Sequence, residues 1–286
     1  MENKLLLEYK IREFLAEDLG FGDVTTDVLI DDDSIAEAEI IFKKGGVLAG
    51  IEEASTVFEV LGCKTKILLN DGDKATPQTA VLKIEGSERA ILKGERVALN
   101  LLMRMSGIAT ATNKALSSAR EFNPKIRVAA TRKTTPGFRY FEKKAVKIGG
   151  GDTHRLRLDD CVLIKDNHLK LMPSINEAVR RALDSVSFTK KIEVEVESSS
   201  QAIEAVEAGA DIVMLDNMKP EEIQITLREL EKRGIREKTL IEASGGITVE
   251  NIVDYAKIGV DIISLGSLTH SVQALDVSLR IHGVRK

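Results

Sequence analysis

Three short stretches carry the side chains best suited to chemistry. They are TRKTTPG at residues 131–137, GGGDTHRLRLDD at residues 149–160 and LIKDNH at residues 163–168. Between Arg127 and Lys170 the chain has eleven Lys and Arg but only five Asp and Glu, although its net charge is −4. These charges are interleaved with glycines and apolar runs, so we interpret the segment as a local anion site. The acidic balance elsewhere argues against a general nucleic-acid binder.

Six apolar, β-branched runs follow Lys125, and polar residues stand where most of them end. The runs are IRVAAT, VLIKD, IEVEVE, DIVMLD, LIEASG and DIISLG. Amphipathic stretches with glycine near their carboxyl ends separate the later runs, as in SQAIEAVEAGA and TVENIVDYAKIG. Alternation of this kind is typical of parallel βα units.

An open doubly wound sheet and a barrel are both compatible with this alternation. The repeated joints EAGADIVMLDN and KIGVDIISLGS favour a barrel, and no GxGxxG or P-loop pattern follows a strand. A full eight-stranded barrel needs roughly 250 residues, and only about 160 remain after Lys125. We therefore expect a smaller or incomplete barrel, whose strand ends converge on one mouth that holds the active site.

The polar strand ends divide into two chemical groups. One group is cationic and suits carboxylates and phosphates: Arg132, Lys133, His154, Arg155 and Lys165. The other is the pair Glu195 and Asp216, which could hold Mg²⁺ against phosphate oxygens. Strand alternation puts Glu193, Glu195 and Glu197 on one face, so depth along the strand must decide which of them acts.

Two glycine-containing joints near the end of the chain suit a phosphate. Ser244-Gly245-Gly246 and Gly266-Ser267 follow the last two expected strands. Glycine lets backbone N–H groups approach a phosphate closely, and the start of a following helix adds a favourable dipole. An ordinary turn at the end of a strand is the alternative at each joint.

The first hundred residues read as mixed α and β. We expect a helix up to Leu19, two strands joined by Gly45-Gly46, a helix ending at Gly62, and strands within 64–75 and 79–87. Residues 89–120 form a long apolar helical pattern, which we expect to be broken near Gly107. A domain boundary is expected in or near this segment.

Composition indicates a cytosolic protein. The sequence has no apolar run of about 18 residues and no basic, cleavable leader, so neither a membrane span nor a secretory signal is expected. Cys63 and Cys161 are read as reduced, buried thiols rather than as a disulfide. The remaining histidines, His168, His270 and His282, are assigned mainly to structural or surface roles.

Taken together, these motifs resemble the quinolinate phosphoribosyltransferase family. TRKTTPG, GGGDTHRLRLDD, LIKDNH, EVEVES, LDNM, EASGGI and ISLGSLTHS come in that family's order and spacing, and EDLGFGDVTTD and ERVALNLLMRMSGIAT also match. The resemblance implies an α/β sandwich domain at residues 1–108 and an incomplete α/β barrel of about seven strands at residues 109–269. The tail at 270–286 is expected to pack back on the first domain.

The resemblance also implies a reaction. Quinolinate and phosphoribosyl pyrophosphate would give nicotinate mononucleotide, pyrophosphate and CO₂, with Mg²⁺ required. The implied catalytic residues are Lys133, Lys165, Glu195 and Asp216, the last two on the metal and ribose side. The implied substrate-binding residues are Arg96, Thr131, Arg132, Lys133, His154, Arg155, Lys165, Ser244, Gly245, Gly246 and Gly266. Arg96 would be lent to a neighbouring subunit, which implies a homodimer or a hexamer built as a trimer of dimers.

One residue departs from the family pattern. Thr153 stands where the family often has Asn, which affects the turn before His154.

Three other functions are weighed against this reaction. A related branch associated with molybdenum transport shares the fold and part of the motifs. A metabolite-binding regulatory barrel would show gaps in the motif set. An aldol or isomerase barrel would need a single Schiff-base lysine or general base rather than five cations.

Overall fold

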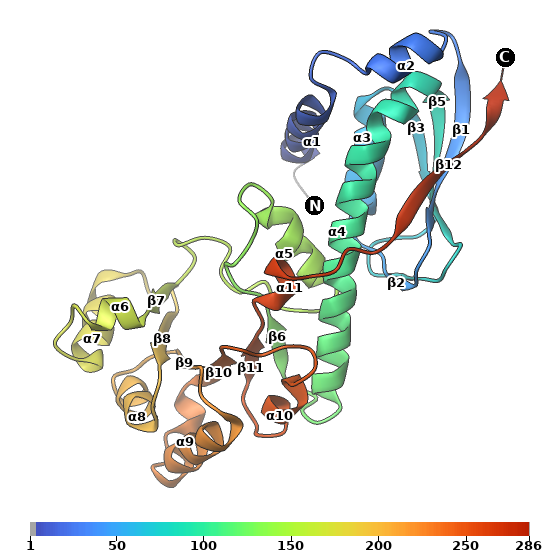
Figure 1. Cartoon of the computed structure of the whole chain (residues 1–286). Helices are drawn as coiled ribbons and strands as arrows, with labels where there is room; N and C mark the ends of the chain where they lie inside the picture. The colour runs from blue at the N-terminus through green and yellow to red at the C-terminus, as the bar shows by residue number, and fades with distance from the viewer. Residues whose placement is uncertain (1–3, 286) are drawn as a thin grey trace. The chain divides into compact units, whose positions relative to one another are not determined.

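The computed structural model describes residues 4–285 and divides into two compact units (Figure 1). The first runs to Thr110 and takes in the chain again from Val272, and the second comprises Ala111–Ser271. The boundaries expected from sequence lay after residues 108 and 269. No helix in the described part of the chain is long and apolar enough to cross a membrane.

The first unit is built on a four-stranded antiparallel sheet in the order β12-β1-β5-β3. Its elements are α1 (Lys4–Leu19), α2 (Val24–Leu29), β1 (Ile35–Phe42), β2 (Gly46–Val47), α3 (Ile51–Val60), β3 (Lys64–Ile67), β4 (Lys74–Ala75), β5 (Ala80–Ser87) and β12 (Val277–Arg285). Ala36, Ala38 and Ile40 of β1 are buried, whereas Glu37 is exposed. This alternation makes one face of the sheet apolar.

Two features of this unit differ from simple expectation. The strands on either side of Gly45-Gly46 do not pair with each other, because β1 pairs with β5 and β12 while β2 pairs with β4. The tail forms β12, which lies antiparallel beside β1 from Val277 to Arg285. Val277, Leu279 and Ile281 alternate with polar residues as a strand would, although only packing against the first domain was expected of this tail.

The expected break near Gly107 is wrong, because α4 (Glu88–Arg120) is one continuous helix of 33 residues. A Cβ atom at Gly107 would lie closer than 3.0 Å to the backbone carbonyl oxygen of Gln273. Gly107 therefore serves packing: it lets the returning chain at residues 273–274 cross the helix at close range. The glycine marks a crossing and not a helix end.

The second unit holds a six-stranded parallel sheet in the order β6-β11-β10-β9-β8-β7. The strands are β6 (Arg127–Ala129), β7 (Val162–Ile164), β8 (Ile192–Val196), β9 (Ile212–Asp216), β10 (Leu240–Ser244) and β11 (Ile262–Ser264). The helices are α5 (Arg139–Ile148), α6 (Asp166–Leu169), α7 (Ile175–Ser185), α8 (Ser199–Glu207), α9 (Pro220–Lys232), α10 (Ile252–Ala256) and α11 (Ser267–His270), with a short 3₁₀ turn at Arg236–Lys238. All six expected strands are present.

This sheet is an incomplete barrel. β6 pairs with β11, so the first strand of the unit lies beside the last. On its other side β6 makes a single parallel bridge, between Ala129 and Asp152, and no ladder between described residues joins that segment to β7. The expected seven strands are thus six strands and one bridge. The segment at Asp152 is too short for its periodicity to be read from sequence.

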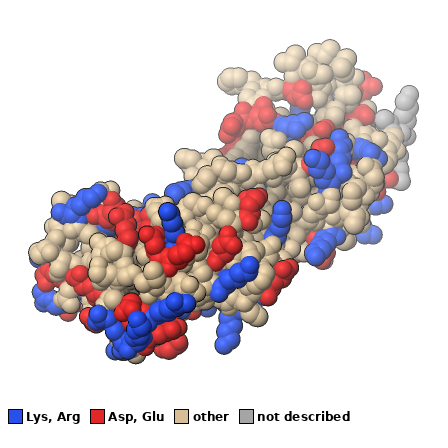
Figure 2. Space-filling view, turned by 60° about the horizontal axis from the view of Figure 1, so that its bottom comes forward, with Lys and Arg blue, Asp and Glu red and all other residues tan. Residues whose placement is uncertain are grey.

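Buried aliphatic side chains fill the space between these strands and helices. Val194, Val213, Ile241 and Ile263 come from four adjacent strands and are fully buried. Helices contribute a second layer that includes Val179. Basic and acidic side chains are intermixed on the face shown in Figure 2.

Candidate active site

A cavity of about 330 Å³ opens at the carboxyl ends of the parallel strands in the second unit. Because these ends meet at one edge of the sheet, polar residues that follow different strands come together there. The lining consists of Ala130, Thr131, Arg132, Lys133, His154, Arg155, Leu163, Lys165, Glu195, Met214, Asp216, Glu242, Ser244 and Ser264. Nine of these fourteen are residues singled out from the sequence.

The inward-facing side chains form layers with a period of two residues. Glu195 of β8, Met214 of β9 and Glu242 of β10 are level with one another, and Asp216 is level with Ser244 in the layer above. Glu193 lies one layer below Glu195, and neither Glu193 nor Glu242 has exposed surface. The three glutamates of β8 are therefore sorted by depth: Glu193 is buried, Glu195 lines the cavity and Glu197 is exposed.

Carboxylates and one lysine face each other on one side of the cavity. Lys165 Nζ lies 2.6 Å from Glu195 Oε2, and the Glu195 side chain is only 11% exposed. Burial raises the pKa of Asp216, and the charge of Glu195 raises it further, while Lys165 and Lys133 act in the opposite direction. The two carboxylates are thus close enough to repel each other in a partly buried setting.

Helix α5 holds the loop that carries Arg132 and Lys133. Glu142 is fully buried and accepts hydrogen bonds from the backbone N–H and the hydroxyl of Thr135, each at 3.1 Å. Arg139 Nε donates to the hydroxyl of Thr134 at 2.9 Å. Arg132 Nε is buried and has no hydrogen-bond acceptor in the described part of the chain. The loop is therefore fixed while that donor stays available.

The glycine turn is tightly packed beneath the cavity. Gly150 has a φ of 90°, and a Cβ atom at Gly151 would lie closer than 3.0 Å to side chains of Thr112 and Val146. Asp152 N donates to Val128 O at 2.8 Å, which ties the turn to β6. The glycines thus let the chain turn close to the strand, as expected from their spacing.

Lys143 of α5 is hydrogen-bonded to Thr153, the residue that follows Asp152 in the turn. Its Nζ donates to the carbonyl oxygen of Thr153, and the residue is 1% exposed. Burial lowers the pKa of Lys143 to about 8, and the nearby charge of Arg139 adds to that effect. Thr153 therefore contributes its carbonyl to the turn, an interaction that does not depend on its side chain.

His154 sits in the left-handed region, with a φ of 50°. Its Nε2 atom lies 3.4 Å from Glu193 Oε2 and 3.3 Å from Glu242 Oε2. Burial lowers the pKa of His154, but hydrogen bonds and charges from the two glutamates outweigh it and raise the pKa to about 10. Ser264 donates its hydroxyl hydrogen to the other oxygen of Glu242.

Of the two proposed phosphate joints, the first has left-handed glycines, whereas Gly266 in the second has a φ of −65°. Gly245 has a φ of 93° and Gly246 a φ of 62°, and a Cβ atom at Gly245 would lie closer than 3.0 Å to Asn217. A Cβ at Gly266 would lie about 3.1 Å from Lys133 Cδ. A helix was expected to begin directly after Gly246, but α10 begins only at Ile252. Its dipole therefore does not start at this joint.

Several lining residues were not singled out from the sequence. Glu242 and Ser264 lie inside the runs LIEASG and DIISLG, and Leu163 and Met214 supply apolar walls. Every second residue of a strand faces the same side. The residues two positions before Lys165, Asp216 and Ser244 could therefore have been predicted to face the cavity as well. In contrast, Arg96 lies on α4 in the first unit and is not part of this lining.

The remaining motif residues have local roles. Asp160 accepts from the backbone N–H groups of Leu156 and Arg157, and Arg157 pairs with Asp159 at 3.5 Å on the surface. His168 Nδ1 accepts from Lys165 N at 2.9 Å, and His270 is exposed. Both cysteines are free, with Cys63 buried and Cys161 only partly so.

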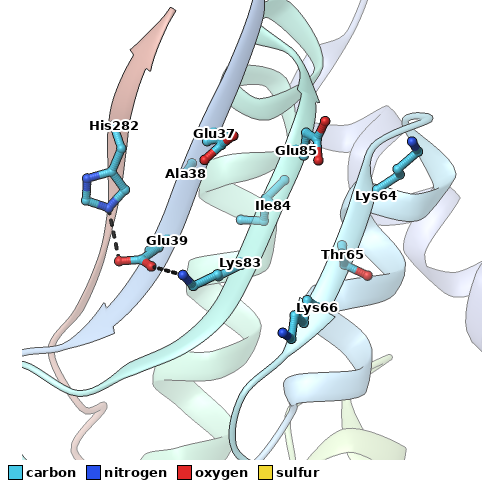
Figure 3. Close-up of a pocket in the computed structure, with 10 residues that line it drawn as sticks. All are labelled: Glu37, Ala38, Glu39, Lys64, Thr65, Lys66, Lys83, Ile84, Glu85 and His282. Atoms are coloured by element: carbon cyan, nitrogen blue, oxygen red, sulfur yellow. Dashed lines mark hydrogen bonds and ion pairs between the residues drawn. The ribbon is translucent and has the colours of Figure 1, made fainter. Parts of the chain in front are cut away.

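A second hollow of about 290 Å³ lies on the sheet of the first unit (Figure 3). Glu39 is at its centre, 3.0 Å from His282 Nε2 and 3.2 Å from Lys83 Nζ. Hydrogen bonding by Lys83 and His282 lowers the pKa of Glu39. These charges neutralise one another, and none of the residues expected to act on substrate lines this hollow.

Comparison with known proteins matches both units to one family. The model of the quinolinate phosphoribosyl transferase C-terminal domain matches residues 108–280, and that of the N-terminal domain matches residues 23–106. The chain belongs to the quinolinate phosphoribosyltransferase family. It is therefore a phosphoribosyltransferase enzyme, of a family that serves NAD biosynthesis.

Individual relatives agree with this assignment over nearly the whole chain. A Methanothermobacter thermautotrophicus protein named "Probable nicotinate-nucleotide pyrophosphorylase (carboxylating)" is 52% identical over 96% of this chain and 99% of its own length. The Homo sapiens nicotinate-nucleotide pyrophosphorylase (carboxylating) is 42% identical over 86% of this chain and 82% of its own. The crystal structure of NadC from Streptococcus pyogenes has a TM-score of 0.91 at 37% identity, covering 100% and 98% of the two chains.

Proposed function

We propose that the cavity of the second unit carries out the family's reaction on quinolinate. The chain transfers the phosphoribosyl group of phosphoribosyl pyrophosphate to quinolinate with decarboxylation, which gives nicotinate mononucleotide, pyrophosphate and CO₂. One observation carries the assignment of this cavity: cationic loops and a carboxylate pair face the same space. A dianion and a sugar that develops positive charge need these two opposite surfaces side by side.

The cationic side of the cavity suits the two carboxylates of quinolinate. Arg132 and Arg155 can each donate two parallel hydrogen bonds to a carboxylate, and Lys133 adds a point charge. The unpartnered, buried Nε atom of Arg132 supports this role, because a bound anion would supply its missing acceptor. Thr131 lies beside this group in the same lining.

The carboxylate side suits the ribose and a divalent cation. Glu195 and Asp216 repel each other in a partly buried setting, and a cation would relieve that repulsion, so their chemistry fits Mg²⁺. Bound Mg²⁺ would neutralise charge on the pyrophosphate leaving group. Lys165 already pairs with Glu195, which favours a Glu195 role at the ribose carbon and a larger share of the metal for Asp216.

The bond changes balance without a nucleophilic side chain. The ring nitrogen of quinolinate forms a bond to C1 of the ribose as the C1–oxygen bond to pyrophosphate breaks, and Glu195 and Asp216 stabilise the positive charge at C1. The positively charged ring then accepts the electron pair of the bond to the 2-carboxylate, which leaves as CO₂. The ring carbon takes up a proton. Backbone N–H groups of Gly245, Gly246 and Gly266 suit the 5′-phosphate.

A direct assay tests this function. The purified protein is incubated with Mg²⁺, phosphoribosyl pyrophosphate and either quinolinate or nicotinate, and CO₂ and nicotinate mononucleotide are measured. We expect both products from quinolinate and none from nicotinate, with no turnover after chelation of Mg²⁺. Turnover of nicotinate in place of quinolinate would contradict the proposal.

Two further features belong to the same proposal. We infer a homodimer or a hexamer in which Arg96, on α4 of the first unit, completes the cavity of a neighbouring subunit, as the resemblance of its GERVALN motif to the family implies. We also place the enzyme in the cytoplasm. Two free cysteines, one of them buried, are in keeping with a reducing compartment.

A further inference from the structure

A cluster of charged side chains lies at the floor of the cavity, and the reaction steps above assign it no part. Its members are His154, Glu193 and Glu242, with Ser264 beside them. Glu193 and Glu242 have no exposed surface, on β8 and β10 respectively. Two carboxylates held inside a barrel are costly unless they are compensated by opposite charge or hydrogen bonds.

Both glutamates contact the imidazole of His154. Its Nε2 atom is within 3.4 Å of a carboxylate oxygen of each. Neither oxygen of Glu193 has a hydrogen-bond partner in the described part of the chain, so its contact with His154 is an ion pair at 3.4 Å. Glu242 has a second partner, the hydroxyl of Ser264. The imidazole is therefore the nearest group that compensates Glu193, with the charge of Arg155 acting in the same direction, and it links the glycine turn to the strands.

The backbone at His154 explains why such a link is useful. A non-glycine residue with a φ of 50° persists only where its surroundings hold it in place. His154 N donates to Asp152 Oδ1 at 2.8 Å, and Lys143 holds the carbonyl oxygen of Thr153. These contacts fix the turn before His154, whereas the imidazole fixes His154 itself. The next residue is Arg155.

We propose that Glu193 and Glu242 are positioning residues: they hold the imidazole of His154, and through it they aim Arg155 at the carboxylates of quinolinate. Arg155 is 8% exposed and lines the cavity. A guanidinium that binds a carboxylate through two hydrogen bonds is sensitive to small changes in direction. The inference rests on the proposed function, because it names which substrate the cluster serves.

A metal ion is the other occupant that these residues would suit, because the three ligand atoms lie within 4.8 Å of one another. The protonation of the His154 imidazole argues against a metal ion at this position. The backbone N–H of Arg155 lies 2.7 Å from Nδ1 and favours a lone pair there, whereas the carboxylates favour protons on both nitrogens. In either form Nε2 carries a proton between the two glutamates, which a metal would have to displace.

The main test measures each substrate separately in Glu242→Gln and Glu193→Gln. These variants keep the size of the side chain and remove its charge. We expect KM for quinolinate and the inhibition constant of phthalate, which has both carboxylates but no ring nitrogen, to rise about tenfold or more. KM for phosphoribosyl pyrophosphate is expected to stay within about twofold, because the contacts of the two glutamates run to His154 and Ser264 and, among the described residues, not to Glu195 or Asp216. Equal changes in both KM values, or none, would overturn the proposal.

A double-mutant cycle separates positioning from general structural damage. If the glutamates act through His154, Glu242→Gln adds little to the phthalate defect of His154→Ala. Additive effects contradict the link. Glu207→Gln on α8, a half-exposed glutamate that pairs with Arg233, is the matched control and leaves every constant unchanged.

Two measurements keep the outcomes distinct. Should Glu242→Gln fail to fold, Ser264→Ala removes one donor to Glu242 and is expected to weaken phthalate binding in the same direction; unchanged binding counts against the proposal. One equivalent of metal in the purified wild type that Glu242→Gln lacks would also overturn it. Wild-type protein that does not turn over quinolinate refutes the proposed function instead of this inference.

Discussion

At the scale of single residues, the cavity is organised by depth along each strand. Side chains two residues apart on one strand have different roles: Glu195 lines the substrate space and pairs with Lys165, while Glu193 beneath it pairs with the imidazole of His154. The deeper glutamate has no exposed surface, whereas the upper one can be reached by a ligand. This distinction leads to two predictions on single residues.

Arg132→Ala and Lys165→Ala are each expected to lower kcat/KM roughly 10²–10³-fold, because each removes a charged donor from a largely desolvated site. Steady-state kinetics with both substrates varied measures the effect. Lys190→Ala, an exposed lysine away from the cavity, is the control. Near-normal rates in Arg132→Ala would remove the cationic loop from the mechanism.

The pKa of Lys143 predicts how stability changes with pH. The folded pKa of about 8 lies below the ordinary value of 10.5, so between these values the unfolded chain binds the proton and the folded chain does not. The free energy of unfolding therefore rises with pH across this window. Groups that set this pKa besides burial are Arg139, Asp152, Arg132 and Arg155.

Urea denaturation at about pH 7.5 and about pH 9.5 tests the window, with Lys143→Met compared against the wild type. We expect the wild type to gain stability relative to Lys143→Met as the pH rises. Lys147→Met, on the exposed face of the same helix, should follow the wild type. A constant difference between the wild type and Lys143→Met would show that the lysine stays charged.

The candidate site was largely predictable because parallel strands bring their ends together. Lys165, Glu195 and Asp216 follow or end apolar runs, and that position alone predicts a shared mouth. Alternation from Ser244 could have placed Glu242 at the cavity, but its pairing with His154 could not be predicted. His154 is 88 residues earlier in the chain, and nothing local to LIEASG indicates that partner.

At the scale of elements, long-range packing explains what local pattern did not. Six strands of the second unit were readable because each is a compact apolar run followed by a turn. The expected break in α4 was wrong because Gly107 makes room for the backbone of residues 273–274, which are distant in sequence, and does not end the helix. The segment at Asp152 offers one bridge and no periodicity.

Gly107→Ala tests the packing interpretation of α4. Alanine improves intrinsic helix propensity by about 1 kcal/mol, but its Cβ would meet the backbone of Gln273, which cannot move aside as a flexible side chain could. We expect the clash to dominate and to lower the free energy of unfolding by about 1–3 kcal/mol. Denaturant titration measures it, with Asn100→Ala on the exposed face as control. A stabilised Gly107→Ala protein would contradict this reading.

At the scale of the whole molecule, the match to one family covers both units, and the proposed role of Arg96 would make the activity depend on how subunits assemble. Arg96 lies in the unit that does not carry the cavity. If the residue serves a neighbouring subunit, a monomer lacks part of its own site. Assembly and catalysis would then be one property.

Mixing two inactive variants tests this dependence. Arg96→Ala and Lys165→Ala are unfolded together, refolded as a mixture and assayed. In a symmetric dimer, random assembly should restore about a quarter of the wild-type sites, because half of the dimers contain one intact site. Each variant refolded alone stays inactive. A mixture no more active than its components would place Arg96 in its own subunit's site, or outside any site.

The gap beside β7 has a consequence for how the cavity can vary. Around most of the ring, hydrogen-bonded ladders set the spacing of neighbouring strands. Between the segment at Asp152 and β7 no ladder of described residues does so, and the chain between them is held chiefly by side chains such as Lys143 and His154. The circumference of the mouth is thus adjustable by substitution at a few positions, without a change in the register of any strand.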